Sequence, residues 1–424
     1  MGVPLDFDEA KELDGREPLT ELRNEFEIPK HFDGTDQAYF AGNSLGLLPK
    51  RTRPAIKEAL DQWGGKGVGG HFDGEEAWYR LDERIAALQT GIVGCLPSET
   101  GIMGSLTTNL HMLMASFYRP TVERQKILIE PHAFPSDRYA VAAQVAWHGG
   151  NPNTDVITIK AENPDHLTPD DLERTLHHHK DISLALLGGV NYYTGQFLDI
   201  ASMSPILKSQ EITFGLDLAH AVGNVPLELH DWGIDFASWC TYKYLNSGPG
   251  AVAGAFVHER HVGDDAMPRF EGWWGHNAKR RFLMEPQFDS MGTAEAWQMS
   301  NAPVFNMAIH AIALEQFTAA GMAALRAKSL RLTAYLEAGI AAVAKHNGAR
   351  LEVITPANPA RRGCQLSLVA HGFGQELFQA LTDAGVVVDW REPNVIRMAP
   401  VPMYNTFEDI ARFVHILKSA TQPH

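Results

Sequence analysis

The stretch Phe214–Phe256, FGLDLAHAVGNVPLELHDWGIDFASWCTYKYLNSGPGAVAGAF, decides the fold. It contains an apolar run that ends at Asp217, a second run, IDFASW, and a third, AVAGAF. Short runs of this kind are typical of buried strands. His220 follows the first run, and Tyr242 and Lys243 follow the second. The pattern predicts neighbouring strands whose ends carry reactive side chains.

Short β-rich runs alternate with helical or turn-rich stretches through the central part of the chain. Strands are predicted at KILIE, TDVITI, ISLALLGGV, ITFGLDL, IDFASW and AVAGAFV, with helices such as LTPDDLERTLHHH between them. This order predicts βαβ units and an α/β fold with a mostly parallel central sheet covered on both faces. Ligands of such sheets bind beyond the carboxyl ends of the strands, where Asp217 and the PHAFPSD segment lie.

The pattern changes from about Asn306. An alanine-rich stretch, NMAIHAIALEQFTAAGMAALRAKSLRLTAYLEAGIAAVAKH, predicts two helices broken near Gly321. Short strands at RLEVIT, CQLSLVA and VVVDW and a closing helix at TFEDIARFVHILKS predict a smaller α+β domain. The expected organisation is an N-terminal segment over residues 1–60 that packs with the small domain, a large cofactor-binding domain over 61–305, and the small domain over 306–424.

Composition excludes several functions. The chain has 424 residues, 45% of them hydrophobic, and a net charge of −15, which argues against binding to nucleic acid or an anionic membrane. No secretory signal or membrane span is expected. Three scattered cysteines do not predict a disulfide framework or a zinc site, and they fit a reducing cytoplasm. The tract His177–His179 lies at a predicted helix end without partners, so no metal is expected.

An acid at one strand end and a lysine after the next strand suit pyridoxal phosphate. This cofactor needs a lysine amine for its Schiff base and a carboxylate that keeps its ring nitrogen protonated. Asp217 and Lys243 occur in that order, although neither residue alone is specific. The helix in SLTTNLHMLMASF begins with small polar residues, so its first N–H groups form either a phosphate cup or an ordinary N-cap. Phe134 either lies flat on a planar ring or belongs to the core.

Three further features have two interpretations each. The aromatic stretch Gly272–His276 is either a wall of the site or a packing cluster. Arg397 is either a structural cap or a clamp for a substrate carboxylate. Gly42–Gly46 matches the G-x-S-x-G elbow of serine hydrolases with Ser44 as nucleophile, but Pro49 stands where the elbow helix should begin.

Over nearly its whole length the chain resembles kynureninases, pyridoxal-phosphate enzymes of the fold-type I aminotransferase class. The resemblance is carried by YFAGNSLG, SLTTNLHMLMASFYRP, FPSDRYA, GVNYYTGQ, DLAHAVGNVPLELHDWGIDFASWCTYKYLN, GWWGH, MSNAPVF and DWREPNVIRMAPVPMYN. It implies that Lys243 binds the cofactor, Asp217 pairs with its ring nitrogen and Arg397 binds the substrate carboxylate. The other cofactor contacts that it implies are Leu106, Thr107, Phe134, Pro135, Ser136, Asp137, His220, Tyr242, Trp273 and Asn301.

The family's reaction is the hydrolytic Cβ–Cγ cleavage of L-kynurenine to anthranilate and L-alanine, in tryptophan catabolism. Tyr242 is then a plausible proton carrier beside the lysine. The resemblance also implies a homodimer with shared sites, through Trp273 and Asn301. His71, Ser300 and Asn301 resemble residues of kynureninases that favour 3-hydroxykynurenine. Two alternatives stay open: another fold-type I enzyme, such as a cysteine desulfurase using Cys364, and a serine hydrolase using Ser44.

Overall fold

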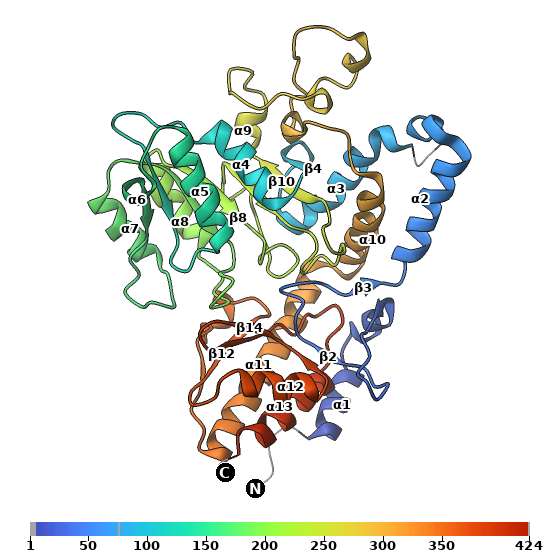
Figure 1. The fold of residues 1–424 in the computed structure, drawn as a ribbon, viewed down its shortest axis with the longest axis vertical. Helices are drawn as coiled ribbons and strands as arrows, with labels where there is room; N and C mark the ends of the chain where they lie inside the picture. Colours follow the sequence, from blue (N-terminus) through green and yellow to red (C-terminus); the bar gives the residue numbers. More distant parts are fainter. Residues whose placement is uncertain (1–5, 75–76, 423–424) are drawn as a thin grey trace.

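The computed structural model describes residues 6–74 and 77–422. A seven-stranded sheet is formed by the central part of the chain, and a four-stranded sheet by its C-terminal part (Figure 1). The large sheet lies in the upper half of Figure 1, and the small sheet lies below it near α1 and α13.

The large sheet has the strand order β4-β10-β9-β8-β7-β5-β6. Strands β5 to β9 pair in parallel, whereas β10 runs antiparallel to both β9 and β4. The predicted mostly parallel sheet is therefore confirmed. The strands are β4 (Thr100–Met103), β5 (Lys126–Ile129), β6 (Val156–Thr158), β7 (Ile182–Gly188), β8 (Thr213–Asp217), β9 (Phe236–Trp239) and β10 (Ala253–Val257).

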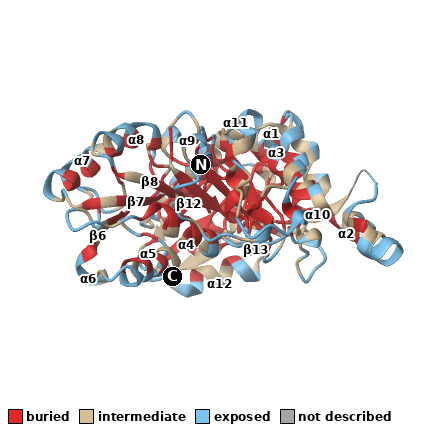
Figure 2. Cartoon of the chain, turned by 90° about the horizontal axis from the view of Figure 1, so that it is seen from above, coloured by how far each residue is buried: buried red, intermediate tan, exposed pale blue. Residues whose placement is uncertain are grey.

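Helices cover both faces of the large sheet (Figure 2). In β7, Leu184 and Leu186 pack in the core with α4 and α5, whereas Ala185 and Leu187 pack in the core with α7 and α8. Successive side chains of a strand point to opposite faces, so a sheet buried on both sides needs continuous apolar strands. The helices are α4 (Leu106–Phe117), α5 (Pro135–Trp147), α6 (Pro152–Asp155), α7 (Pro169–His178), α8 (Ile200–Ser209) and α9 (Glu259–Val262).

The small sheet is antiparallel, in the order β11-β12-β15-β14. The predicted strand VVVDW is two elements, because β13 pairs in parallel with β2 of the N-terminal segment while β14 joins the small sheet. The elements are β11 (Leu351–Val353), β12 (Leu366–Ala370), α12 (Gln375–Asp383), β13 (Val386–Val387), β14 (Asp389–Arg391), β15 (Val395–Met398), α13 (Phe407–Ala420) and the short helix η8 (Pro359–Arg361).

The alanine-rich stretch forms α10 (Val304–Ala320) and α11 (Met322–Asn347), which meet at Gly321 as predicted. Gly321 has a φ of 76°, which an L side chain adopts only with strain. Within the described residues, no single helix is long and apolar enough to cross a membrane; α10 and α11 pass that test only as a pair, bent by 80°.

The N-terminal segment contacts both parts of the molecule. Helix α1 packs on α13 of the small domain, and α2 packs on α10, which belongs to the core of the large sheet. The predicted boundary at residue 60 falls inside α2. Helix α3, four short helices and three two-residue strands complete the described part of this region. Its elements are α1 (Phe7–Gly15), η1 (Thr20–Glu25), β1 (Phe26–Glu27), β2 (Ala38–Tyr39), β3 (Leu48–Pro49), α2 (Thr52–Lys66), η2 (Gly67–His71), η3 (Trp78–Arg80), α3 (Leu81–Val93) and η4 (Pro97–Glu99).

The two cores divide within α11 rather than before α10. Met307 and Phe317 of α10, and Leu325 of α11, belong to the core of the large sheet. From Leu332 onwards the buried side chains of α11 belong to the core of the small sheet. The predicted boundary between residues 305 and 306 therefore precedes a helix that packs with the large domain, and we place the division between residues 325 and 332.

Candidate active site

A cavity of about 460 Å³ opens beyond the carboxyl ends of the parallel strands, between the large sheet and segments of the small domain. It brings together most of the predicted site residues. Its lining is Asn43, Ser44, Ser105, Leu106, Thr107, Glu130, Phe134, Ser136, Asp137, Gly188, Val190, Tyr192, Asp217, Ala219, His220, Tyr242, Lys243, Arg391 and Arg397.

Lys243 reaches the cavity from the turn after β9. Its Nζ lies 2.9 Å from His220 Nε2 and 5.9 Å from the ring centre of Phe134. Burial, reinforced by the positive charges of Lys243 and Arg397, holds the pKa of His220 well below its usual value. The neutral imidazole can therefore accept a hydrogen bond from the lysine.

Asp217 is the last residue of β8 and is buried. One of its oxygens accepts a hydrogen bond from the N–H of Ala219, at 2.7 Å. Burial raises the pKa of Asp217, and burial together with the charge of Asp217 raises that of Asp137. The buried Asp217 and the partly buried Asp137 thus face one cavity, where two neighbouring carboxyl groups favour a cationic ligand group beside Asp217.

The first turn of α4 forms a concave polar surface at one end of the cavity. Ser105 is its N-cap, but its side chain contacts Thr108 instead of capping the backbone. Thr107 Oγ1 lies 3.0 Å from Ser136 Oγ, which stands in the first turn of α5 after Pro135. Two hydroxyls and the free N–H groups of a helix N-terminus form a binding site for an anion such as phosphate.

Phe134 presents its ring to the cavity and is 42% exposed, although it is large and apolar. Tyr192 packs edge-on against it, with ring centres 5.1 Å apart. A planar ligand ring can therefore stack on Phe134 while the tyrosine holds the phenylalanine in place.

Arg397 enters the cavity from β15 and is 1% exposed. It donates to the backbone oxygen of Tyr192 at 2.7 Å and is paired with Asp389. The hydroxyl of Ser44 also donates to Asp389. The guanidinium is thus already oriented toward the cavity, as a carboxylate clamp requires.

Five predicted residues lie outside this chain's own cavity lining. One of them, Pro135, begins α5 between Phe134 and Ser136, which do line the cavity. His71 ends η2 and packs edge-on against Trp78 at 5.3 Å. Trp273 begins η5 (Trp273–Gly275) and is 48% exposed. Ser300 and Asn301 are also exposed. All three residues belong to one long excursion, residues 263–303, between α9 and α10. That excursion also contains η6 (Arg281–Leu283) and η7 (Ala294–Trp297).

The sequence interpretation missed several cavity residues. Glu130 follows β5 and accepts hydrogen bonds from the N–H of Gly188, at 2.8 Å, and the amide of Asn191, at 3.0 Å. Burial raises its pKa to about 7. The position of Glu130 at the end of a predicted strand, directly before PHAFPSD, could have identified it as a cavity residue. Asn43, Tyr192 and Arg391 carry no comparable signal, because the chain brings them to the cavity from loops or from the small domain. Asp389, which pairs with Arg397 behind the lining, carries none either.

The serine-hydrolase interpretation is wrong on geometry. The strand before Ser44 ends at Tyr39, and the next helix begins only at Thr52, so the strand-turn-helix of a nucleophile elbow is absent from this described segment. Cys364 is fully buried before β12, and burial raises its pKa to about 12, so it is not a reactive thiolate.

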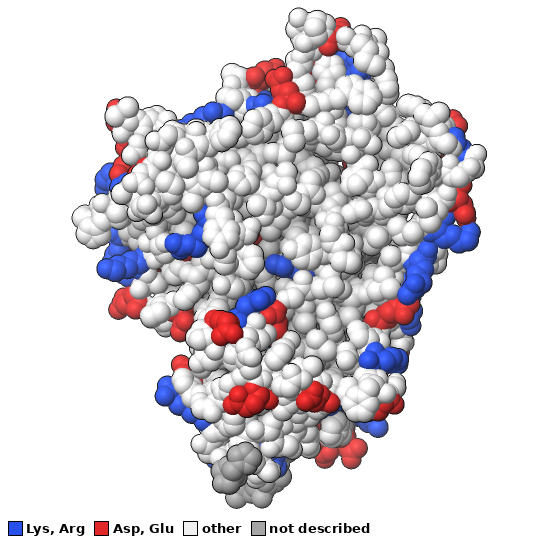
Figure 3. Space-filling view, in the orientation of Figure 1, with Lys and Arg blue, Asp and Glu red and all other residues white. Residues whose placement is uncertain are grey.

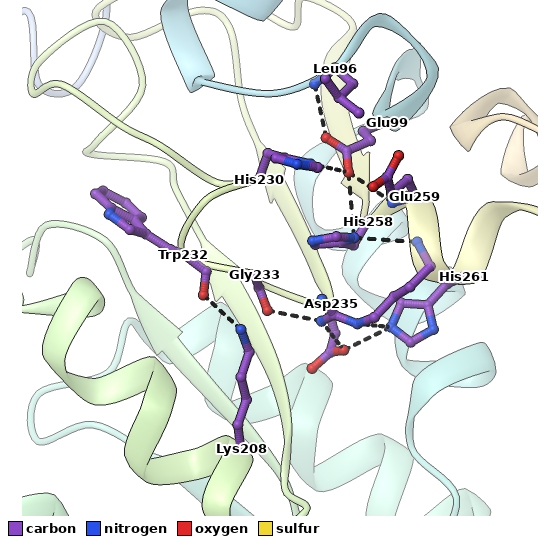
Figure 4. Close-up of polar contacts among 11 residues, drawn as sticks. Leu96, Glu99, Lys208, His230, Trp232, Gly233, Asp235, His258, Glu259 and His261 are labelled. Atoms are coloured by element: carbon purple, nitrogen blue, oxygen red, sulfur yellow. Dashed lines mark hydrogen bonds and ion pairs between the residues drawn. The ribbon is translucent and has the colours of Figure 1, made fainter.

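One cluster outside the cavity contains metal-ligating residue types: Glu99, His230 and His258, whose ligand atoms lie within 4.8 Å of one another (Figure 4). The potential ligand atoms of this cluster already make hydrogen bonds within the protein. Glu99 accepts from the N–H groups of Leu96 and Glu259, and from His230 at 2.9 Å. His258 Nδ1 accepts from a backbone N–H of α9. We interpret the cluster as a structural link between η4 and α9.

Comparison with solved structures defines the class. The fold is similar to a complex of the cystine C–S lyase C-DES with cysteine persulfide (TM-score 0.76, 18% identity, 93% of this chain and 100% of that chain). It is similar also to a cysteine desulfurase from Thermococcus onnurineus (TM-score 0.76, 15% identity, 99% and 98%). The chain has the fold of the fold-type I pyridoxal-phosphate enzymes, and at these identities the likeness concerns the fold alone.

Curated relatives define the family. The chain is 47% identical to a kynureninase from Flavobacterium psychrophilum, over 96% of each chain, and 50% identical to one from Xanthomonas axonopodis pv. citri, over 98% of each. The family model for the kynureninase C-terminal domain matches residues 325–417. The chain belongs to the kynureninase family, whose members are pyridoxal-phosphate-dependent hydrolases.

Proposed function

We propose that the cavity carries out the hydrolytic Cβ–Cγ cleavage of L-kynurenine or 3-hydroxy-L-kynurenine, giving anthranilate or 3-hydroxyanthranilate and L-alanine. The observation that carries this proposal is the pair of Lys243 and buried Asp217 facing one cavity, in a chain of this family. Three free cysteines support a cytoplasmic location. The products support a role in tryptophan catabolism and NAD biosynthesis.

The lining fits pyridoxal phosphate. The anion site at α4 suits the phosphate, Asp217 suits a protonated ring nitrogen, and Phe134 suits the face of the ring. His220 Nδ1 is buried without a hydrogen-bond partner, so the polar lining has unused capacity on this side. In the proposed assignment, Lys243 binds the cofactor covalently, and the remaining contacts come from Leu106, Thr107, Pro135, Ser136, Asp137, His220 and Tyr242.

The bound cofactor supplies an electron sink for cleavage of bonds at the substrate's Cα and Cβ. The chain's own residues then position the substrate and transfer protons. Arg397 binds the α-carboxylate. Lys243 Nζ, once released by the substrate, accepts the proton from Cα. Burial raises the pKa of Tyr242, so its hydroxyl keeps a proton at neutral pH and can donate it as the bond breaks.

Replacement of the lysine tests the assignment directly. Lys243→Ala should abolish turnover and the absorbance of covalently bound cofactor, because no other lysine lines the described cavity. Lys180→Ala, an exposed lysine outside the cavity, is the matched control and should behave as wild type. A Lys243→Ala enzyme with normal turnover of kynurenine would refute the proposal.

We also propose that the active unit is a homodimer in which Trp273 and Asn301 complete the partner's cavity. Both residues lie outside the chain's own cavity lining, and the middle of the face in Figure 3 has few charged side chains, as the core of an interface does. Mixing Lys243→Ala chains with Asn301→Ala chains should restore activity, because one site of each heterodimer then has both residues. Verified heterodimers without recovery would refute shared sites.

We propose that the hydroxylated substrate is preferred, through His71, Ser300 and Asn301. A buried phenolic hydroxyl needs a polar partner, since an unpaired one costs about 1–3 kcal/mol. His71 and Asn301 can supply that partner, and Ser300 leaves room. Replacing His71 by Leu and Asn301 by Leu should depress kcat/KM for 3-hydroxykynurenine more than for kynurenine. Equal losses on both substrates, or a wild-type preference for kynurenine, would contradict this choice.

A further inference from the structure

We propose that Asp82 is a positioning residue: it fixes the segment that carries Trp273 and Asn301, and through that segment it acts on the cavity of the partner subunit. The inference rests on the shared sites proposed above. It concerns a buried carboxylate on α3 that lies outside the chain's own cavity lining.

Two arms of one excursion meet beside Asp82. The first arm holds Trp273 and Trp274, and the second holds Met299 and Asn301. The N–H of Trp274 donates to the oxygen of Met299, at 3.3 Å. A Cβ at Gly272 would lie 2.3 Å from the Cα of Met299, so the two backbones touch where only glycine fits. The position of one arm therefore determines the position of the other.

Asp82 binds both arms with a single carboxylate oxygen. Its Oδ2 accepts from the indole N–H of Trp274 and from the amide of Gln298, at 3.1 Å. The other oxygen accepts from the N–H of Glu83, at 3.1 Å. Asp82 is 2% exposed, so its loss would leave the indole N–H of Trp274 without an acceptor. It would also remove one of the two acceptors of the Gln298 amide, which donates to the oxygen of Ser300 as well, at 3.2 Å.

The contact extends from Trp274 to Trp273. The guanidinium of Arg281 lies 4.2 Å from the ring centre of Trp274 and donates to that residue's backbone oxygen. The backbone oxygen of Arg281 in turn accepts from the indole N–H of Trp273, at 3.1 Å. Asp82, Trp274, Arg281 and Trp273 thus form one connected chain of contacts that ends at a residue proposed to reach the partner's cofactor.

Steady-state kinetics give the first test. Asp82→Ala should lower kcat/KM for kynurenine by about 10- to 100-fold, mainly through a higher KM and weaker cofactor binding, because displaced contacts weaken binding. Asp82→Asn, which keeps an acceptor oxygen, should recover part of the loss. Glu83→Ala removes the neighbouring carboxylate, which pairs only with exposed Arg80 among the contacts described, and should be unchanged.

Heterodimer complementation separates positioning from a general structural role. Asp82→Ala mixed with Lys243→Ala should regain activity, because one site combines an intact lysine with an intact excursion from the other chain. Asp82→Ala mixed with Asn301→Ala should not, because both chains then carry a defective excursion. If Asp82→Ala does not fold, Trp274→Phe, which keeps a ring but loses the donor, takes its place in both mixtures.

The outcomes distinguish this inference from the function on which it rests. If Asn301→Ala complements Lys243→Ala but Asp82→Ala does not, sites are shared and the role of Asp82 is refuted. If neither variant complements, shared sites fail and the inference fails with them. Wild-type kinetics of Asp82→Ala would also overturn it, whatever the mixtures show.

Discussion

At the scale of single residues, Asp217 shows how the fold prepares a group for its ligand. The carboxylate ends a buried strand, and burial raises its pKa. A cationic partner in the cavity reverses that effect, because an opposite charge favours the ionised form. Asp217 therefore fits the role of holding a protonated ring nitrogen.

We predict that Asp217→Ala lowers kcat by orders of magnitude, since removal of one partner from a buried charged pair costs roughly 2–5 kcal/mol. Asp217→Asn should fail similarly, because an amide carries no charge. Asp170→Asn, an exposed carboxylate of α7, is the control and should keep wild-type rates. An Asp217→Asn enzyme with full kcat would exclude the charge as the essential property.

At the scale of elements, the loop after β2 lies directly against the lysine turn. The N–H of Gly46 donates to the oxygen of Tyr242, at 2.8 Å. A Cβ at Gly46 would lie 2.3 Å from the backbone oxygen of Lys243 and 2.8 Å from the Cα of Asn246. Gly46 is the last residue of the motif YFAGNSLG. Because Gly46 has no side chain, the loop can contact the turn that carries Lys243.

Gly46→Ala should consequently displace the lysine turn and reduce kcat by at least about tenfold, as a misplaced group does. The matched control is Gly15→Ala at the end of α1, where a Cβ meets nothing within 4 Å. Kinetics and the absorbance of bound cofactor measure the effect. Wild-type rates in Gly46→Ala would show that the turn adapts without cost.

The link between η4 and α9 makes stability depend on pH. The hydrogen bond to Glu99 raises the pKa of His230 above its ordinary value of 6.5. The contribution of this hydrogen bond to the free energy of unfolding is therefore fully present below the pKa that His230 has in the unfolded chain. It is lost as the pH rises through the higher pKa that His230 has in the folded chain. His230→Gln should lower the unfolding midpoint more at pH 5.5 than at pH 8.5. His178→Gln, an exposed histidine of α7, should show no such pH-dependent difference.

At the scale of the whole molecule, the cavity joins the two cores. Asp217 ends β8 and Lys243 follows β9 of the large sheet, whereas Arg391 and Arg397 come from the small sheet. Asn43 comes from the N-terminal segment, whose β2 pairs with β13. A ligand that contacts all three parts stabilises their arrangement as well as its own site.

Removal of pyridoxal phosphate should therefore lower the Tm, and adding it back should restore the Tm. A ligand that binds only the folded chain stabilises it by about 2.7 kcal/mol at 100 times its Kd. Calorimetry with and without cofactor measures the shift. Lys243→Ala should show a smaller shift, because it retains only the noncovalent contacts. Equal melting of both forms of the wild type would contradict the cavity as the cofactor site.

The sequence by itself determined the sheet, the break at Gly321 and the order of Asp217 and Lys243. These depend on local information: apolar runs, turn residues and strand ends. The tertiary structure alone brought Tyr192 and Arg391 to the cavity and Asp389 to Arg397, split VVVDW between two sheets, and made the two cores meet within α11. It also placed Asp82 beneath two arms more than 190 residues away in the chain. Such contacts depend on how distant segments pack, and residue spacing carries no record of them.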